Sequence, residues 1–162
     1  MKGNAMRFWF DTEFYEKGRT IDLISIGIVA ADGRQYYAET RMAKLLCSRS
    51  EWLENNVLPH LIGPIRDVSV IADEIVDFMG EKPEIWAYFA AYDWVVLCQL
   101  FGTMMDLPKG WPMYCRDVKQ LCDMLGNPDL PIQTGAEHHA IADALWTRDA
   151  HHFLQSRQLK AA

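Results

Sequence analysis

Residues 7–14 read Arg-Phe-Trp-Phe-Asp-Thr-Glu-Phe, and this stretch decides the expected fold. Its aromatic side chains predict a β-strand in the middle of a sheet. Side chains two positions apart in a strand project from the same face, with α-carbons ~6.5 Å apart. Asp11 and Glu13 therefore share one face, and Thr12 points to the other.

Two carboxylates on such a strand repel each other unless something cationic lies between them. A hard divalent cation suits oxygen ligands of this kind. An Asp-x-Glu pair taken alone is more often the solvated edge of a sheet. The aromatic neighbours of Asp11 and Glu13 favour a metal site, because unpaired acids are costly on a central strand.

The segments that follow this strand predict the fold class. After a polar turn at residues 15–19, we expect strands at 21–30 and 34–40, which open the fold as a three-stranded antiparallel meander. Hydrophobic spacing and the positions of Gly and Pro predict the remaining elements. These are helices at 50–58, 70–79, 93–105, 117–126 and 139–155, and strands at 84–88 and 113–115. This order predicts an α/β fold with a five-stranded mixed sheet and helices on both faces.

Length and composition limit the class of protein. The 162 residues favour one domain, which we place at 6–160, and a content of 50% hydrophobic and 12% aromatic residues excludes a disordered or collagen-like chain. We expect residues 1–5 to be a leader or a remnant of cloning, with Met6 as an alternative start. No apolar run reaches the ~18–20 residues of a membrane span, so we expect a soluble, cytoplasmic protein.

The cysteines and the net charge bear on partners. The cysteines at 47, 98, 115 and 122 form no C-x-x-C pair, which indicates free thiols rather than a zinc site. A net charge of −6 counts against nucleic acid as a partner. Two bound divalent cations would reduce that charge to −2 and place positive charge where a phosphate must lie.

Two further acids, Asp93 and Asp143, have sequence surroundings that are compatible with a functional site. Asp93 comes just after the predicted strand 84–88, at the end of a strand where sheet proteins often place their sites. The simpler interpretation is a helix N-cap, or a first-turn acid that the helix dipole favours. Asp143 stands between Ala142 and Ala144, whose small side chains allow close approach. An ordinary solvent-facing helical position is the alternative for Asp143.

Three patterns together resemble one family. F-D-T-E-F at 10–14, A-Y-D-x-x-x-L at 91–97 and H-x-x-x-x-D-A at 138–144 occur in the order of the three motifs of the DEDDh 3′-5′ exonucleases. The motifs span most of the chain. The resemblance implies a ribonuclease H-like fold in which Asp11, Glu13, Asp93 and Asp143 hold two Mg²⁺ or Mn²⁺ ions. It also implies that His138 is the general base.

A narrower resemblance concerns the substrate. With G-R-T-I-D-L-I-S-I-G at 18–27, the chain looks closest to small bacterial exoribonucleases described as polyadenylate-specific. This implies release of nucleoside 5′-monophosphates from the 3′ end of single-stranded RNA, with adenine-rich ends favoured. Related small enzymes are often homodimers. One departure is Phe89, since many members carry a polar residue four positions before the second-motif acid.

The resemblance also assigns roles within the site. Two ions ~3.5–4 Å apart stabilise the attacking and leaving oxygens of a phosphodiester. Asp11 is the best candidate to bridge both ions, with Glu13 and Asp143 on one ion and Asp93 on the other. Phe14 directly follows Glu13, so its ring is a candidate to stack on a base. A core position on the opposite face is the alternative for Phe14.

Helix geometry and the resemblance favour different members of the adjacent pair His138 and His139 as the general base. On a continuous helix His139 and Asp143 share a face, whereas His138 and Asp143 lie ~140° apart. The resemblance favours His138, and the conflict disappears if His138 precedes the helix. We follow the resemblance. We expect His60, His151 and His152 to be surface or packing residues.

Other classes of function remain open at this point. The motifs do not distinguish RNA from DNA, so a DEDDh exodeoxyribonuclease of the proofreading or repair type is the main alternative. A non-catalytic nucleic-acid-binding domain would not need all five motif residues. A structural metal domain would close its site with Cys or His.

Overall fold

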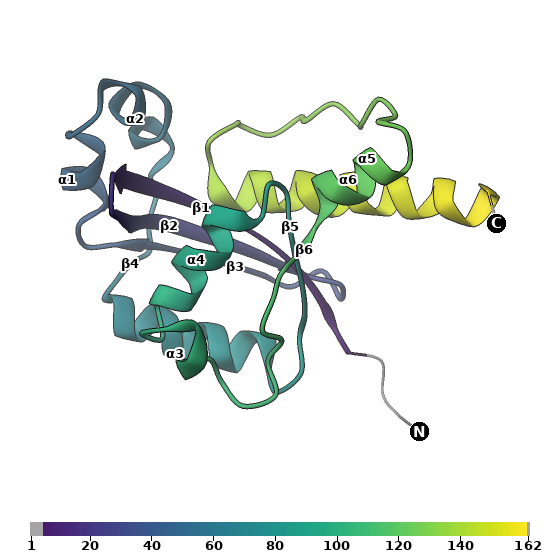
Figure 1. Ribbon diagram of the computed structural model, residues 1–162. Coiled ribbons are helices and arrows are strands. Elements are labelled where there is room, and N and C mark those ends of the chain that lie inside the picture. Colours follow the sequence, from purple (N-terminus) through teal and green to yellow (C-terminus); the bar gives the residue numbers. More distant parts are fainter. Residues whose placement is uncertain (1–4, 162) are drawn as a thin grey trace.

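A single mixed sheet forms the centre of the protein, and the computed structural model describes residues 5–161 (Figure 1). Most of the expected leader at residues 1–5 lies outside the described residues. The strand order is β4-β3-β2-β1-β5-β6. The first three strands are antiparallel, β5 and β6 continue the sheet parallel to β1, and β4 is parallel to β3. The strands are β1 (Arg7–Lys17), β2 (Thr20–Ala30), β3 (Gln35–Thr40), β4 (Ile65–Arg66), β5 (Glu84–Ala87) and β6 (Arg116–Asp117).

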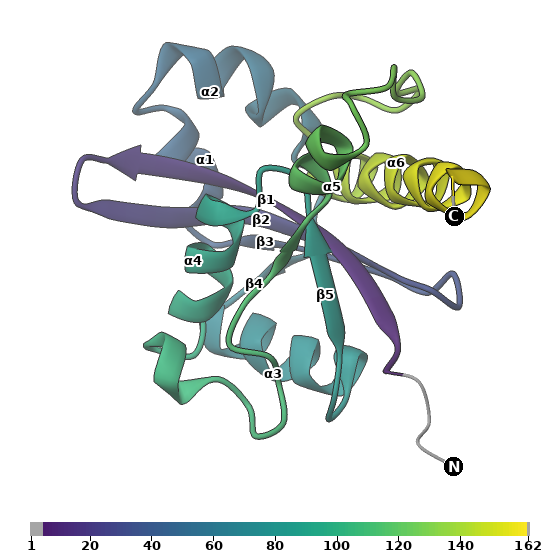
Figure 2. The ribbon, with the colours of Figure 1, turned by 45° about the vertical axis from the view of Figure 1, so that its right-hand side comes forward.

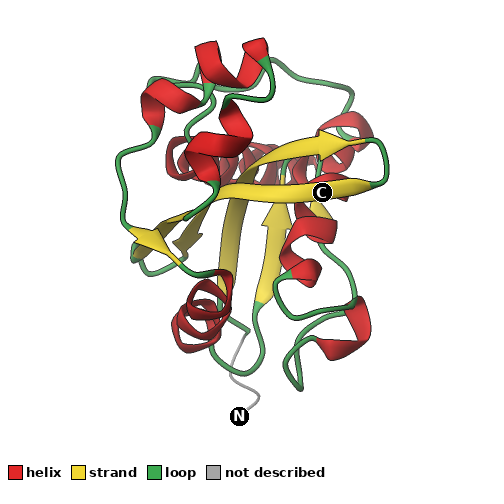
Figure 3. Cartoon of the chain, turned by 90° about the vertical axis from the view of Figure 1, so that its left-hand side faces the viewer, coloured by secondary structure: helices red, strands yellow, loops and turns green. Residues whose placement is uncertain are grey.

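Helices cover both faces of this sheet, as expected (Figures 2 and 3). Helix α6 crosses one face over β1 and β2, and α3 and α4 pack on the other. Short helices α1 and α2 close one end of the sheet, and α5 lies against α6. The α-helices are α1 (Ala43–Cys47), α2 (Glu51–Asn56), α3 (Val68–Met79), α4 (Ala91–Gln99), α5 (Val118–Met124) and α6 (Ala140–Ala161); the 3-10 turns are η1 (Leu58–His60) and η2 (Met104–Asp106).

Alternation along β1 decides which side chains meet which helix layer. Phe8 and Phe10 pack into the main core beneath α3 and α4. Trp9 points the other way and donates a 2.9 Å hydrogen bond from Nε1 to Nδ1 of His151 on α6. Because Asp11 and Glu13 continue the Trp9 side of the strand, they project toward the layer that contains α6.

The predicted number of strands was wrong, since the sheet has six strands and not five. The additional strand, β4, is a two-residue pairing alongside Glu39 and Thr40. A strand of that length has no hydrophobic period to detect. The last predicted strand, at 113–115, lies instead at Arg116–Asp117. The polar turn expected at 15–19 is shorter, because β1 continues to Lys17.

Helix positions were better predicted than helix ends. The helix expected at 93–105 is α4, which starts at Ala91 and ends at Gln99. It ends early because Gly102 adopts a φ of 113° and Thr103 forms a capping box with Asp106 that starts η2. The prediction missed α1, a five-residue helix. The N-cap role of Asp117 is confirmed, because its side chain accepts a hydrogen bond from the Lys119 N–H.

The histidine and cysteine interpretations agree with the structure. His151 is a fully buried packing residue between Trp9 and Trp86, where burial lowers its pKa to about 4. All four cysteines are free. No described helix combines the length and the apolar character needed to cross a membrane.

Helix α6 packs directly against the backbone of β2 at Gly27. A Cβ atom at this position would lie 2.4 Å from the carbonyl carbon of Ala140 and 2.4 Å from the backbone nitrogen of Ile141. Both atoms belong to the first turn of α6, which carries Asp143. The absence of a side chain at Gly27 therefore sets how near Asp143 comes to β1.

We expect Gly27→Ala to destabilise the protein by about 2 kcal/mol or more, because backbone atoms that collide with the new Cβ cannot rotate away as a side chain would. Urea unfolding measures this change, and Ser25→Ala, which removes volume from the same face of β2, serves as the comparison. The helix must move away from the strand, so catalytic activity should fall as well. A Gly27→Ala protein with unchanged stability would show that α6 adapts freely.

Candidate active site

Three carboxylates from distant parts of the chain converge on one face of the sheet. Asp11 and Glu13 lie on β1, and Asp143 lies in the first turn of α6. One oxygen of each lies within 4.8 Å of the others. No other group of three or more potential ligands of this kind occurs among the residues that the structure describes. The arrangement offers only oxygen ligands, which is the donor set that a hard divalent cation takes.

Asp93 reaches the same region from the opposite helix layer. It lies in the first turn of α4, where it is 6% exposed. Its Oδ1 accepts a 2.8 Å hydrogen bond from the Thr12 N–H and a 2.6 Å bond from the Thr12 hydroxyl. Thr12 stands between Asp11 and Glu13, so these two bonds fix Asp93 beside the other acids. They leave Oδ2 of Asp93 available to a ligand.

The sheet topology explains this position. β5 pairs with β1 only along Arg7, Phe8 and Trp9. Beyond Trp9 the edge of β1 has no strand partner on that side, and the turn into α4 takes the place of one. A backbone N–H buried at such an edge requires an acceptor, which Asp93 supplies. Of the two simpler interpretations of Asp93, the N-cap is wrong, because the helix has no side-chain cap, and the position of an acid in the first turn of the helix is confirmed.

Burial raises the pKa of all four acids, and the charges of the neighbouring acids add to the rise at Asp11 and Glu13. The pKa of Asp11 lies well above its usual value because of burial first, and then because of the negative charges of Asp93, Glu13 and Asp143. Burial, followed by Asp143 and Asp93, raises the pKa of Glu13 to about 8. Burial raises the pKa of Asp93 to about 6 and also raises that of Asp143. Concentrated negative charge of this kind is what a bound cation would relieve.

Glu13→Gln should stabilise the protein in EDTA at pH 8. A raised pKa means that the folded state holds a proton that the unfolded state loses, so the stability linked to Glu13 is present below about pH 4.5 and lost as the pH approaches about 8. One pKa unit corresponds to about 1.4 kcal/mol, so we expect a gain of a few kcal/mol at pH 8.

Thermal melts of both proteins across this pH range test the expectation. The gain should shrink toward pH 5, and Glu137→Gln, at an exposed glutamate of the same region, should show no such trend. Destabilisation of Glu13→Gln at pH 8 would mean that native contacts already compensate the Glu13 charge.

His138 precedes the last helix, which removes the objection from helix geometry. α6 starts at Ala140, and His138 lies before it with a φ of 62°. Its ring packs edge-on against that of Trp52, with the ring centroids 4.7 Å apart. His139 packs against Tyr37 instead, and its Nε2 is buried without a hydrogen-bond partner. Burial, then the charge of His60, lowers the pKa of His139.

A cavity of about 470 Å³ is lined by His138 together with Asp11 and Asp143, but not by Glu13 or Asp93. Its lining residues are Asp11, Tyr88, Phe89, Gln133, Glu137, His138, Asp143, Trp146 and Thr147. A second cavity of about 500 Å³ lies at the other end of β2 and contains a single carboxylate, Asp22. Only the first cavity combines several acids with a histidine.

The loop at 127–139 forms one wall of the acid-lined cavity. Gln133 donates a 2.5 Å hydrogen bond from Nε2 to Oδ1 of Asp143. Trp146 donates a 2.8 Å bond from its indole nitrogen to the Pro131 carbonyl. These contacts hold the loop on α6. The sequence analysis missed Gln133 and Trp52, because neither belongs to a motif and only the folded chain places them beside the acids.

Phe14 lies away from this cavity. A register shift between Glu13 and Phe14 interrupts the pairing of β1 with β2 at this point. The ring of Phe14 stacks on Tyr92 at 5.7 Å with an interplanar angle of 8°, and it packs against the main core. Its position matches the core alternative considered for it. Phe89, in contrast, lines the cavity.

Comparisons with known proteins found a matching family model and similar relatives. A family model described as "3′-5′ exoribonuclease Rv2179c-like domain" matches residues 6–155. Two relatives from Mycobacterium tuberculosis strains, 3′-5′ exoribonuclease Rv2179c and 3′-5′ exoribonuclease MT2234.1, are each 40% identical over 147 residues, covering 86% of this chain and 87% of the relative. Among solved structures, the yeast NOT1 MIF4G domain co-crystallized with CAF1 aligns with a TM-score of 0.48 at 14% identity, covering 98% of this chain and 80% of that chain.

Proposed function

We propose, from the premise that this chain belongs to the Rv2179c-like 3′-5′ exoribonuclease family, that it shortens single-stranded RNA from adenine-rich 3′ ends. The chain is an enzyme, a small bacterial-type 3′-5′ exoribonuclease of the DEDDh group. The single observation that carries the chemical proposal is the convergence of Asp11, Glu13 and Asp143 within 4.8 Å in the region of His138. The mixed sheet with helices on both faces supports a ribonuclease H-like fold.

The four carboxylates fit two divalent cations, Mg²⁺ or Mn²⁺. Asp11 belongs to the cluster with Glu13 and Asp143, and the charge of Asp93 also raises its pKa, which suits Asp11 to bind both ions. Glu13 and Asp143 would complete the shell of one ion, and Asp93 would offer Oδ2 to the other. When bound, two such ions supply positive charge that stabilises the attacking and leaving oxygens of phosphodiester hydrolysis.

The protein's own groups perform the remaining steps. His138, beside the acids, takes the proton from the water that attacks the terminal phosphodiester. Trp52 supports the His138 ring from one side and limits its orientation. Thr12 holds Asp93 through two hydrogen bonds, so that the carboxylate keeps its place when a substrate enters. The products are nucleoside 5′-monophosphates, released one at a time.

Labelled oligonucleotides test the reaction. The pure protein is incubated with 5′-labelled RNA and DNA of the same sequence, in Mg²⁺, in Mn²⁺ or in EDTA. We expect a ladder of RNA products shortened from the 3′ end, no reaction in EDTA, and inhibition by a 3′-phosphate. Cleavage of a circular RNA would contradict an exonuclease.

Three further properties belong to the same proposal. Faster degradation of A-runs than of U- or C-runs would support the adenine preference, and equal rates would leave a general exoribonuclease. Faster degradation of DNA would favour the exodeoxyribonuclease alternative. A homodimer also follows from the resemblance, and sedimentation of the pure protein tests it. A cytoplasmic location is proposed from the sequence, which has no apolar run long enough for a membrane span.

A further inference from the structure

Backbone strain is concentrated around the acid-lined cavity. Among the residues that the structure describes, three that are not glycine have positive φ: Phe89 at 55°, Asn127 at 53° and His138 at 62°. Two of these, Phe89 and His138, line the cavity. A bulky side chain is unfavourable in this region of φ, and strained residues of this kind cluster at functional sites. The role of His138 accounts for one of the two.

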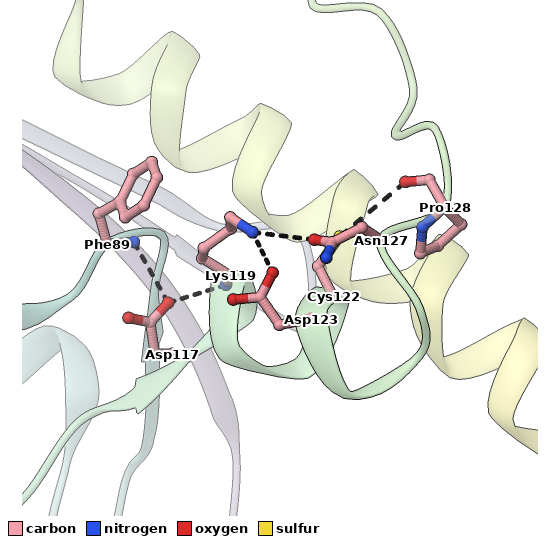
Figure 4. A network of polar contacts seen from close by, with 7 residues as sticks. All are labelled: Phe89, Asp117, Lys119, Cys122, Asp123, Asn127 and Pro128. Carbon is pink, nitrogen blue, oxygen red and sulfur yellow. Dashed lines mark hydrogen bonds and ion pairs between the residues drawn. The ribbon is translucent and has the colours of Figure 1, made fainter.

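Asp117 holds the strained turn at Phe89 in place. Its carboxylate accepts a 3.2 Å hydrogen bond from the Phe89 N–H through Oδ1 and another of 3.2 Å from the Ala90 N–H through Oδ2. The same Oδ1 accepts a 2.8 Å bond from the Lys119 N–H at the start of α5 (Figure 4). One carboxylate therefore joins the end of β6, the start of α5 and the turn that leads into α4.

The same helix also anchors the opposite wall of the cavity. Lys119 bonds through Nζ to Asp123 within α5 and, at 2.9 Å, to the side-chain oxygen of Asn127, where the 127–139 loop begins (Figure 4). That loop leads to Gln133 and His138. Through Asp117 and Lys119, the start of α5 is therefore hydrogen-bonded both to the turn at Phe89 and to the first residue of the loop that leads to His138.

The ring of Phe89 is exposed although it lines a cavity. It points away from Asp117 in Figure 4, and the residue is 63% exposed. The ring of Tyr88 packs edge-on against that of Phe89, with the ring centroids 4.7 Å apart, and against that of Trp146, with the centroids 4.9 Å apart. The three rings form a continuous aromatic wall beside Asp11 and Asp143. The chain thus maintains a strained turn that presents an apolar ring to solvent.

Resting on the function proposed above, we propose that Phe89 is a stacking surface for a base at the 3′ end of the RNA and that Asp117 is its positioning residue. The acids occupy the part of the cavity that suits the phosphate, and Phe89 offers the flat apolar surface that suits the base. Every base has an aromatic face, so stacking binds a single strand without reading its sequence.

Substitutions at Phe89, assayed on matched RNAs, test the proposal. One RNA ends in normal nucleotides, and the other has abasic ribose at its last two positions. Loss of one stacked base typically weakens binding ~5- to 150-fold, so Phe89→Ala should raise KM on the normal RNA by a factor in this range with little change in kcat. Phe89→Tyr keeps an aromatic face and should retain the wild-type KM. On the abasic RNA, wild type and Phe89→Ala should have equal KM.

A second set of variants tests whether Asp117 affects RNA binding through Phe89. Asp117→Ser keeps a helix-capping oxygen for α5 but cannot hold both N–H groups of the turn. We expect it to raise KM on the normal RNA and to add nothing further when Phe89 is already Ala. Tyr114 is an aromatic residue outside the cavity that is 56% exposed, against 63% for Phe89, so Tyr114→Ala is the control and should behave as wild type.

Three results would overturn the proposal. An unchanged KM of Phe89→Ala on the normal RNA excludes stacking, and so does an equal rise in KM on both RNAs. A changed sedimentation coefficient with unchanged KM would show that Phe89 contacts a second copy of the chain instead. A wild-type protein that degrades neither RNA would instead contradict the proposed function, so the two failures are distinguishable.

Discussion

Asp11→Asn should reduce RNA hydrolysis by ~10³-fold or more while leaving the fold intact, because a bound metal ion supplies several kcal/mol of transition-state stabilisation. The substitution is nearly isosteric and removes only the charge. Asp11 is the acid whose pKa is raised by all three of the others, so it lies at the centre of the negative charge. Loss of this carboxylate removes a ligand that both proposed ions share.

Thermal melting with and without Mn²⁺ separates loss of metal from loss of fold. A ligand at 100 times its Kd stabilises the folded state by about 2.7 kcal/mol, and wild type should show an upward shift of this kind. Asp11→Asn should melt at least as high as wild type in EDTA and gain much less from Mn²⁺. The exposed Asp73 on α3 provides the control, since Asp73→Asn should behave as wild type. Equal Mn²⁺ shifts in Asp11→Asn and wild type would contradict the assignment of Asp11 as a ligand.

The acid pair on β1 shows how much of the site a local sequence pattern can predict. The two-residue period of a strand is enough to place Asp11 and Glu13 on one face, and the structure has them there, facing α6. Asp143 joins them only because Gly27 lets α6 approach β2 at backbone distance. Nothing in the spacing of 27 and 143 along the chain indicates this approach. The family resemblance linked these segments where local periodicity could not.

The elements that were missed depend on long-range contacts. β4 exists because Ile65 and Arg66 lie beside β3, and two residues carry no pattern of their own. Phe89 seemed only a departure from a motif, because the sequence does not show that Asp117 would hold it at positive φ. Gln133 likewise meets Asp143 across a loop whose path is set by Trp146 and α5. Contacts of this kind join residues that are far apart in the sequence, so they can be identified only once the fold is known.

The choice between His138 and His139 as the general base depended on where the last helix begins. Helix geometry favoured His139 on the assumption that the last helix includes both residues. α6 begins one residue after His139, and the left-handed conformation of His138 turns its side chain out of the helical path. Helix ends are the least certain part of a sequence-based assignment, because capping and tertiary contacts shift them by one or two residues.

His138→Ala should lower kcat by the ~10²–10⁴-fold that is typical of a lost general base. Because the four carboxylates remain, the upward shift in melting temperature on addition of Mn²⁺ should stay at the wild-type value. His139→Ala is the matched control, since its ring contacts Tyr37 and its Nε2 is buried, and we expect a small change in kcat with some loss of stability. Added imidazole should restore part of the activity of His138→Ala and none of that of His139→Ala.

These measurements also identify the other possible outcome. If His139→Ala shows the larger loss of kcat, the base reaches the acids from within α6 and the positive φ of His138 has only a structural role. A loss of the Mn²⁺ shift in His138→Ala would mean that the residue supports metal binding rather than proton transfer. Intact metal binding, a large loss of kcat and rescue by imidazole would together identify His138 as the side chain that takes the proton. His138 is the one histidine among the residues that line the cavity with Asp11 and Asp143.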